Sequence, residues 1–499
     1  MVLKGGKNMR KGSILLVVLL MILLLAFCLL CTGCGGNQEA ASSEQTVYRS
    51  GNYDNIRLID QTVYRSGNYE YILLEDGTAE ITRYTGNAAE LSVPDTLDGH
   101  SVTSIGDDAF SWCTALASIT LPEGLTSIGD GAFSYCRSLT SITLPGGVTG
   151  IGDRAFKACQ SLTDIKLPEG VTGIGDSAFS DCAALTSITL PEGLTSIGDS
   201  AFSSCISLTS IEIPNSVTEM GSNPFECCSK LTDIRLSLDH PVFATVDGVL
   251  FNKVEKKLVC YPRAFTATGY QVPKGIRSIG NRAFYMCPLI NITLPEGVNS
   301  IEDKAFAWCR SLRSITLSEG LTSIGEDAFC YCTSLTSITL PEGVTSIGNS
   351  AFYTCESLIS IDLPKSVTSM GEKAFASCTA LRSITLPEGM ISIGNGVFGN
   401  CRSLTRITLP EGVTSIGNSA FAYCTALSSI TLPEGVTGIG DSAFYSCTAL
   451  SSITLPEGLT SIGKDAFYEC PDYLYFAVVK DSWAEQWCKD KGYSYSYSR

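Results

Sequence analysis

Phenylalanine recurs along most of this chain at an almost constant interval of 23 residues, each time inside the same surrounding phrase. The fifteen copies fall in two series, six before a longer gap and nine after it: Phe110, Phe133, Phe156, Phe179, Phe202 and Phe225, then Phe284, Phe306, Phe329, Phe352, Phe375, Phe398, Phe421, Phe444 and Phe467. A repeat of this length cannot bury its apolar face alone, so successive copies stack into a solenoid. The period therefore overrides the expectation of about three separate globular domains for a chain of 499 residues.

One copy of the repeat, SLTSITLPEGVTSIGNSAFYTC, runs from Ser334 to Cys355. Its LTSITL segment alternates apolar and hydroxyl side chains, which is typical of a half-buried strand. The PEG that follows predicts a turn, since Pro restricts φ and Gly suits the last turn position. VTSI continues in extended form until Gly348, and the Asp or Asn that follows predicts the cap of a short helical turn. Each repeat should thus contribute a strand, a return segment and a short helical turn.

The N-terminus carries a different signal. A basic segment with Lys4, Lys7, Arg10 and Lys11 precedes a long apolar run, which predicts a secretory signal peptide over residues 1–33. The TGC that follows resembles the lipobox of bacterial lipoproteins, which implies lipidation of Cys34, although Cys31 stands where that family usually has Leu. An uncleaved transmembrane anchor is the alternative, because about 17 to 25 apolar residues can span a bilayer. Both interpretations place most of the chain outside the cytoplasm, at a bacterial cell surface.

Charge and composition exclude several functions. The formal net charge is −16, and it becomes −20 without the first 33 residues, which hold four basic residues and no acid. Such a chain should repel nucleic acid, whose binding depends on Lys and Arg contacts to phosphate. His100 and His240 are the only histidines, so no metal site is predicted. Neither a complete phosphate loop nor a G-x-S-x-G elbow occurs. We therefore predict a protein that is not an enzyme and needs no cofactor.

The pattern LxxIxLPxGVTSIGxxAFxxCxxL closely resembles the BspA-like class of bacterial leucine-rich repeats. The resemblance covers about residues 100 to 470, and the segment from Tyr69 is similar to the N-terminal module of that family. It implies a β-rich solenoid with a parallel sheet on the concave face and short helical turns opposite. It also implies a surface protein that binds host or neighbouring-cell macromolecules.

The whole chain divides accordingly. Residues 34–68 are predicted to be a tether with a partial duplication, because QTVYRSGNY occurs at 45–53 and again at 61–69. An N-terminal β module over 69–99 precedes the two repeat blocks, 100–236 and 276–470. The insertion at 237–275 contains VDGVLFNKVEKKLVCYP, which predicts a β-hairpin of two strands, either a joint or a binding protrusion. Residues 471–499 are predicted to be a helix-and-strand cap, since an uncovered last repeat would expose its core.

Cysteine is abundant, and fifteen of the 22 cysteines stand three residues after the repeated Phe. Neighbouring rungs of a solenoid are close enough for disulfides. The rungs are nevertheless odd in number, equivalent and apolar in context, so buried free thiols are favoured. Four other cysteines, Cys227, Cys260, Cys330 and Cys488, are predicted to be more exposed.

The candidate binding surface is the outward side of the strands. Most outward positions are Ser or Thr, and the exceptions include Asn291 and Asp362. Six charged exceptions are the candidate ligand-binding residues: Asp164, Lys166, Glu212, Asp233, Arg235 and Arg406. An array of this kind favours an adhesin that binds an extracellular protein or glycoprotein. Three alternatives stay open: tolerated variation on a solvated surface, a structural envelope or biofilm component that self-associates, and a carbohydrate-binding or carbohydrate-active protein. The last is less favoured, because Trp112 and Trp308 lie on the turn side.

Overall fold

The computed structural model describes residues 62–498, which from Val63 onward belong to one unit, Val63–Arg499. The predicted signal peptide, Cys34 and the first copy of the duplication lie outside the described residues. The second copy enters the fold. Tyr64–Ser66, expected in the tether, forms strand β1 and pairs antiparallel with β2 (Tyr69–Leu73), because its alternating side chains extend the N-terminal sheet.

The N-terminal module continues through β3 (Ala79–Tyr84) and β5 (Thr96–Leu97) to β6 (His100–Ile105). β2 and β3 pair antiparallel, whereas β3 and β6 pair parallel. The parallel register then continues into the repeats, since Ile105 lies opposite Ile128. The module therefore converts an antiparallel sheet into the first rung of the solenoid.

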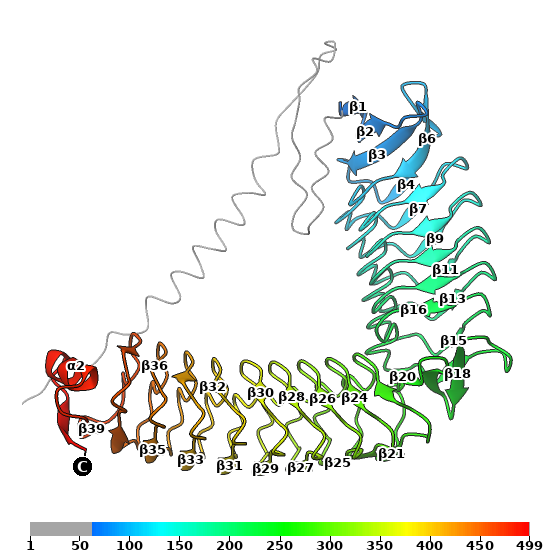
Figure 1. The fold of residues 1–499 in the computed structure, drawn as a ribbon. Coiled ribbons are helices and arrows are strands. Elements are labelled where there is room, and N and C mark those ends of the chain that lie inside the picture. The colour runs from blue at the N-terminus through cyan, green and yellow to red at the C-terminus, as the bar shows by residue number, and fades with distance from the viewer. Residues whose placement is uncertain (1–61, 499) are drawn as a thin grey trace, which may run out of the picture. The chain divides into compact units, whose positions relative to one another are not determined.

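Each repeat contributes two short strands, which line up in two separate rows (Figure 1). The SIT row consists of the three-residue strands β4 (Glu90–Ser92), β7 (Ser118–Thr120), β9 (Ser141–Thr143), β11 (Asp164–Lys166), β13 (Ser187–Thr189), β15 (Ser210–Glu212), β17 (Asp233–Arg235), β21 (Gly269–Gln271), β23 (Asn291–Thr293), β25 (Ser314–Thr316), β27 (Ser337–Thr339), β29 (Ser360–Asp362), β31 (Ser383–Thr385), β33 (Arg406–Thr408), β35 (Ser429–Thr431) and β37 (Ser452–Thr454). The SI row consists of the two-residue strands β8 (Ser127–Ile128), β10 (Gly150–Ile151), β12 (Gly173–Ile174), β14 (Ser196–Ile197), β16 (Glu219–Met220), β22 (Ser278–Ile279), β24 (Ser300–Ile301), β26 (Ser323–Ile324), β28 (Ser346–Ile347), β30 (Ser369–Met370), β32 (Ser392–Ile393), β34 (Ser415–Ile416), β36 (Gly438–Ile439) and β38 (Ser461–Ile462). Where neighbouring strands of a row pair, they pair in parallel, mostly Ile against Ile.

The third side of each repeat is a chain of turns, where the sequence predicted a short helical turn. Ala351 N–H donates to the Gly348 carbonyl and Cys355 N–H donates to the Phe352 carbonyl, so hydrogen bonds span three residues. Two positions between them, Ser350 and Thr354, have positive φ of 51° and 60°. A left-handed residue interrupts a right-handed helix, so the turns cannot propagate into one. Within residues 62–498 the α-helix is α2 (Trp483–Lys491), in the C-terminal cap.

The predicted cap residue acts between repeats. Asn349 Oδ1 accepts the backbone N–H of Glu372, 23 residues later, at 2.9 Å, and Asp130, Asp153 and Asp441 do the same in other repeats. Gly348 likewise responds to the neighbouring repeat, because a Cβ there would lie 2.6 Å from the backbone nitrogen of Glu326. Both of these turn positions, which recur from repeat to repeat, therefore serve the stacking of repeats.

A column of stacked Phe rings forms the centre of the core in each of the two repeat blocks. Phe352 is fully buried, and its ring stacks between those of Phe329 and Phe375 with centroids 5.3 and 5.2 Å away. Tyrosines begin both columns, since Tyr84 stacks on Phe110 at 5.4 Å and Tyr261 stacks on Phe284 at 5.2 Å. Aromatic pairs of this kind add stability beyond their buried area.

The C-terminal end is closed by β39 (Tyr475–Val478), α2 and β40 (Ser494–Tyr497). β39 extends the SIT row next to β37, and β40 pairs with β39. Helix α2 begins after Ser482, whose side chain accepts the N–H of Glu485, and ends at Gly492 in the left-handed region. The buried Ala484 and Cys488 belong to the core of the second block, so the helix covers the last repeat.

Candidate functional site

The outward positions of the SIT row are solvent-exposed, while the central Ile of each strand is buried, as in β11, β13 and β27. Among the predicted binding residues, Asp164 and Lys166 of β11 are both exposed, as are Glu212 of β15 and Arg235 of β17. Asp233 is half-buried. Strands β11, β13, β15 and β17 follow one another in the row, so the structure brings these five residues onto one patch, here called the charged strip.

Charges within the charged strip partly compensate one another. Arg235 lies beside Glu212 in register, and its guanidinium contacts the carboxylate of Asp233 at 2.6 Å. Lys166 stands one strand further from Glu212 and has no acidic partner among the described residues. Arg406 does not join the strip, because it lies on β33 in the second block. The predicted bounds of the two blocks already placed Arg406 in the second block, apart from the other five candidates.

The insertion forms three strands where two were predicted: β18 (Phe243–Val246), β19 (Val249–Asn252) and β20 (Lys257–Cys260), paired antiparallel. Adjacent residues of this sheet face different cores. Leu250 and Val259 pack with the first block, whereas Phe251 and Leu258 pack with the second. Strand β20 then pairs parallel with β22 and starts the second SI row. The inserted strands are therefore a buried joint between the blocks, and the strand segments do not protrude.

A buried histidine attaches the start of the joint to the first block. His240 is fully buried; its Nε2 hydrogen-bonds the Pro214 carbonyl at 3.1 Å, while Nδ1 accepts the N–H of Phe243. Desolvation lowers the pKa of His240, which favours the neutral ring that this pattern requires. Lys253 Nζ donates to the His240 carbonyl and ties the β19–β20 turn to the same point.

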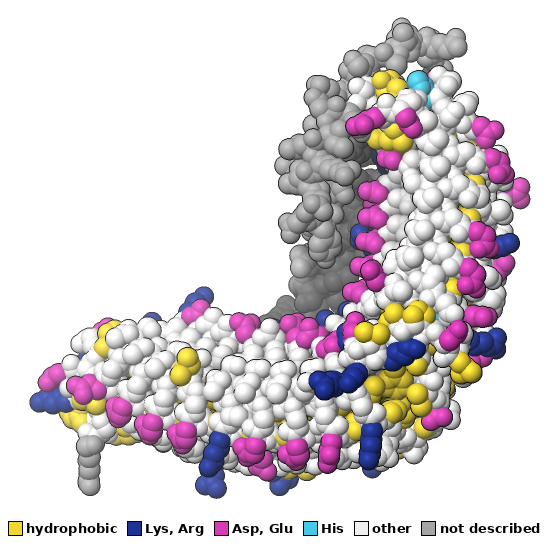
Figure 2. All heavy atoms as spheres, turned by 45° about the vertical axis from the view of Figure 1, so that its right-hand side comes forward, with side chains coloured by type: hydrophobic (Ala, Val, Ile, Leu, Met, Phe, Trp, Pro, Cys, Tyr) yellow, Lys and Arg dark blue, Asp and Glu magenta, His cyan; other side chains and the backbone are white. Residues whose placement is uncertain are grey.

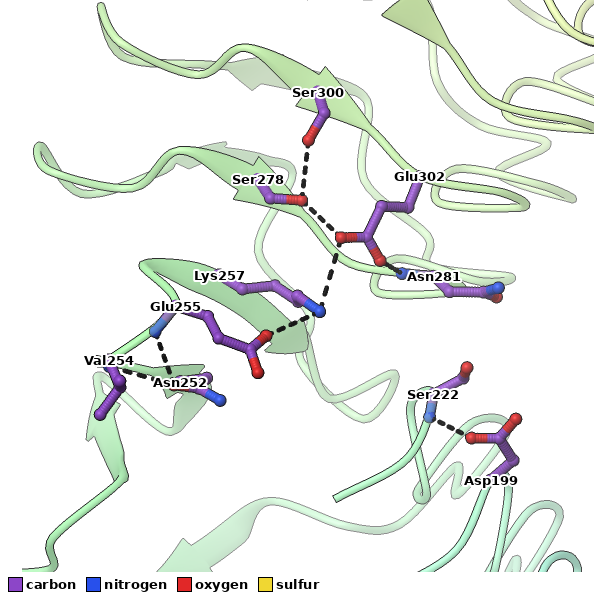
Figure 3. A network of polar contacts seen from close by, with 10 residues as sticks. All are labelled: Asp199, Ser222, Asn252, Val254, Glu255, Lys257, Ser278, Asn281, Ser300 and Glu302. Carbon is purple, nitrogen blue, oxygen red and sulfur yellow. Dashed lines mark hydrogen bonds and ion pairs between the residues drawn. The ribbon is translucent and has the colours of Figure 1, made fainter. Parts of the chain in front are cut away.

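A polar network attaches the joint to the second block (Figure 3). Lys257 of β20 contacts Glu255 at 2.8 Å and Glu302 at 3.6 Å. Glu302 also accepts the hydroxyl of Ser278 and the backbone N–H of Asn281. In the other repeats this position is Gly, as at Gly325, so a single Glu replaces a close backbone approach with side-chain bonds.

The joint, taken from here on as residues 237–282 with the first turn of the second block included, also reverses the local charge. Residues 237–282 contain seven Lys or Arg and three Asp or Glu, whereas 62–236 contain eight against 22 and 283–498 contain 12 against 21. Figure 2 shows Lys and Arg side chains beside an exposed hydrophobic area where the blocks meet. Exposed apolar side chains at the joint include Leu238, Val254 and Val246. Sequence reasoning did not single out this basic surface, although the charge count would have shown it.

All described cysteines are free thiols. From Cys136 onward each rung donates its S–H to a backbone carbonyl of the preceding turn, as Cys355 Sγ does to Phe329 O at 3.2 Å. The acceptor is a Phe carbonyl except at Cys287, which donates to Tyr261. Burial raises the pKa of Cys182 to about 12. The prediction that cysteines outside the ladder are exposed was wrong for Cys260, Cys330 and Cys488, because the joint, a turn and α2 bury them; Cys227 is half-buried.

The described residues hold neither a cluster of metal-binding side chains nor a membrane-spanning helix. Within residues 62–498, no group of three His, Cys, Asp or Glu is placed to hold a metal ion. In the same range, no helix has the length and apolarity needed to cross a bilayer.

Comparison with known proteins agrees with this architecture. The family described as BspA type leucine rich repeat region (6 copies) matches residues 83–183, 149–251, 259–382 and 368–481. A leucine rich cell surface protein from Faecalibacterium prausnitzii is 35% identical, with 64% of this chain and 94% of that chain covered and a TM-score of 0.55. A leucine-rich repeat protein from Bacteroides ovatus is 29% identical, with 90% of this chain and 100% of that chain covered and a TM-score of 0.49. No curated protein matches.

The matched ranges cover both repeat blocks and most of the joint, which is well over half of the chain. The two rows of strands, the Phe column and the thiol rungs are the physical counterpart of that match. The chain belongs to the BspA-type leucine-rich-repeat family.

Proposed function

We propose that this chain is an exported bacterial surface protein of adhesin type, which binds extracellular macromolecules such as host matrix proteins, mucins or neighbouring cells. Family membership and the similarity to a leucine rich cell surface protein support a surface location. The observation that carries the binding role is the SIT row, which presents exposed side chains along each repeat block. A repeated, rigid face of this kind is how solenoid proteins form extended binding surfaces.

Within that face the charged strip is the proposed contact zone. Ser and Thr cover most of the row and can bind almost any polar partner, so they provide area without selectivity. Asp164, Lys166, Glu212, Asp233 and Arg235 add a fixed pattern of both signs on neighbouring strands. Complementary charge patterns mainly set specificity and association rate.

A saturable interaction would test the binding role. Purified protein is offered to immobilised matrix proteins, mucins and glycans, and its oligomeric state is measured in parallel. Binding to one class supports the adhesin function. Absence of any ligand, together with assembly of the protein with itself, would instead support a structural envelope or biofilm role.

The strip is tested with a neutralised variant carrying D164N, K166Q, D233N and R235Q. A matched control, E411Q with E434Q, K464Q and K480Q, neutralises two acids and two bases at exposed sites elsewhere. We expect the strip variant to bind the identified ligand at least about fivefold more weakly, since several exposed pairs at ~0.2–1 kcal/mol each are lost. Equal affinity of both variants would remove the strip from the binding site.

The proposed anchor is a lipid on Cys34 after removal of residues 1–33. The apolar run followed by TGC supports this proposal. The lipid would hold the binding array at the cell surface through residues 34–61. Incorporation of labelled palmitate into the wild-type protein, and its loss in Cys34→Ser, would support it. Label retained by the variant would mean that another residue carries the lipid, and membrane attachment without label would favour the uncleaved transmembrane anchor.

A further inference from the structure

The joint carries a group of exposed cations that the fold does not neutralise. Lys257 and Arg282 form ion pairs with Glu302 and Glu226, at 3.6 and 3.4 Å. Four others are exposed and form no ion pair within 4.0 Å among the described residues; they are here called the joint cations: Lys253, Lys256, Lys274 and Arg277. Lys253 alone has a fixed bond, to the His240 carbonyl.

The backbone places two joint cations side by side. Arg277 N–H donates to the Lys256 carbonyl at 2.7 Å, so these residues occupy the same position on adjacent turns. Lys253 and Lys274 precede them by three residues each, on the same two turns. The next turns continue this line with exposed hydroxyl and amide side chains, since Asn299 N–H donates to the Arg277 carbonyl and Thr322 N–H donates to the Asn299 carbonyl.

The surroundings restrict which polyanion can bind. Net negative charge on the residues before and after the joint flanks the cations on both sides along the array. Duplex DNA carries a charge every ~1.7 Å of its axis, so most of its phosphates would face these acidic blocks. A glycan spaces its anionic groups with neutral, hydroxyl-bearing rings, which suit the Asn and Thr positions beside the cations. The charge of the wider molecule is screened beyond about 8 Å at physiological salt.

We propose that the joint cations form a second binding surface, separate from the charged strip, which takes an anionic polysaccharide. Lys256 and Arg277 contact sulfate or carboxylate groups, and the adjacent Asn299 and Thr322 bond sugar hydroxyls. This proposal deepens the proposed function and rests on it, because such polymers are met outside the cytoplasm.

The test uses the full chain and three immobilised probes: chondroitin sulfate, hyaluronan and a duplex DNA fragment of similar total charge. Binding to chondroitin sulfate alone identifies sulfate as the recognised group, and binding to both glycans identifies carboxylate as sufficient. The variant K256Q with R277Q should lower glycan affinity at least about fivefold, because two exposed ion pairs are removed. The control K365Q with R382Q removes two exposed cations of the second block and should change affinity less than about twofold.

Three outcomes would overturn the proposal: neither glycan binds, the K256Q and R277Q variant binds as wild type with an unchanged melting temperature, or DNA binds as tightly as the glycans and through the same residues. If the glycans fail while a matrix protein or mucin still binds, the inference alone falls. If no extracellular probe binds at all, the proposed function falls with it.

Discussion

The joint makes a sharp prediction, because adjacent strands of one small sheet supply side chains to two different cores. Leu250 of β19 packs with the first block and Leu258 of β20 packs with the second, and both are 0% exposed. Replacing either with Ala removes three buried carbon groups, worth about 2.4 kcal/mol at ~0.8 kcal/mol each. The cavity left behind raises the expected loss of folding free energy to about 2–5 kcal/mol.

The two substitutions should differ in where that loss is felt. Repeat arrays behave approximately as nearest-neighbour chains, so a weakened interface loosens the adjoining repeats first. Hydrogen exchange followed by mass spectrometry resolves this by peptide. Leu250→Ala should speed exchange around Phe202–Phe225, and Leu258→Ala should speed it around Phe284–Phe306.

Leu238→Ala is the matched control, since this leucine lies at the joint but is fully exposed. Its effect should stay within about 0.5 kcal/mol, as for most surface substitutions. Equal acceleration of exchange in both blocks by Leu250→Ala and by Leu258→Ala would refute the separation of cores, because it would mean that the joint unfolds as one element with both neighbours.

Other consequences concern the thiols, the cap and the turn glycines. In the native protein, a thiol reagent should react within minutes with only three cysteines of the described range, the half-exposed Cys113, Cys227 and Cys470. Rapid labelling of many other rungs would contradict their burial. A hydrogen bond from Lys489 holds the pKa of Glu485 near 2, below its usual 4.5, so its contribution to cap stability should persist above pH 5 and disappear as pH falls from 4.5 towards 2. Pepsin cleavage within 471–498 should therefore rise over that range in wild type, whereas Glu485→Gln should show little dependence on pH. Gly348→Ala places a Cβ 2.6 Å from the backbone of Glu326 and should lower the melting temperature clearly, whereas Gly146→Ala, which meets nothing within 4 Å, should not.

Sequence reasoning was most successful where one repeat contains the whole argument. The alternation of LTSITL predicts a strand with a buried Ile, and β27 has that pattern. The apolar context of the Cys rungs favours buried thiols, and Cys355 is fully buried. These features depend on residues a few positions apart, so local periodicity and composition are sufficient to predict them.

The candidate site was only partly predictable. Outward positions on β11, β15 and β17 could be identified by alternation, and the bounds of the two blocks separate Arg406 from the rest. The register that sets Arg235 beside Glu212 depends on which strands are neighbours, and the ion pair of Arg235 with Asp233 depends on how the two side chains lie on β17. The joint was harder still, because a polar turn between two apolar runs predicts a hairpin but leaves open whether it is a joint or a binding protrusion. Its strands are buried on both faces only because two repeat blocks meet there.

The sequence by itself determined the solenoid, since a period of 23 residues leaves stacking as the way to bury Phe, Ile, Leu and Cys together. Tertiary structure alone decided how one repeat satisfies the next. The sequence predicts Asn349 as a cap for its own turn, yet its Oδ1 accepts the backbone N–H of Glu372 in the following repeat. The sequence predicts Gly348 as the end of an extended segment, yet its missing side chain leaves space for the backbone of the preceding repeat. The physical reason is distance along the chain: these contacts join residues about one repeat apart, and they exist only after stacking has brought the backbones together.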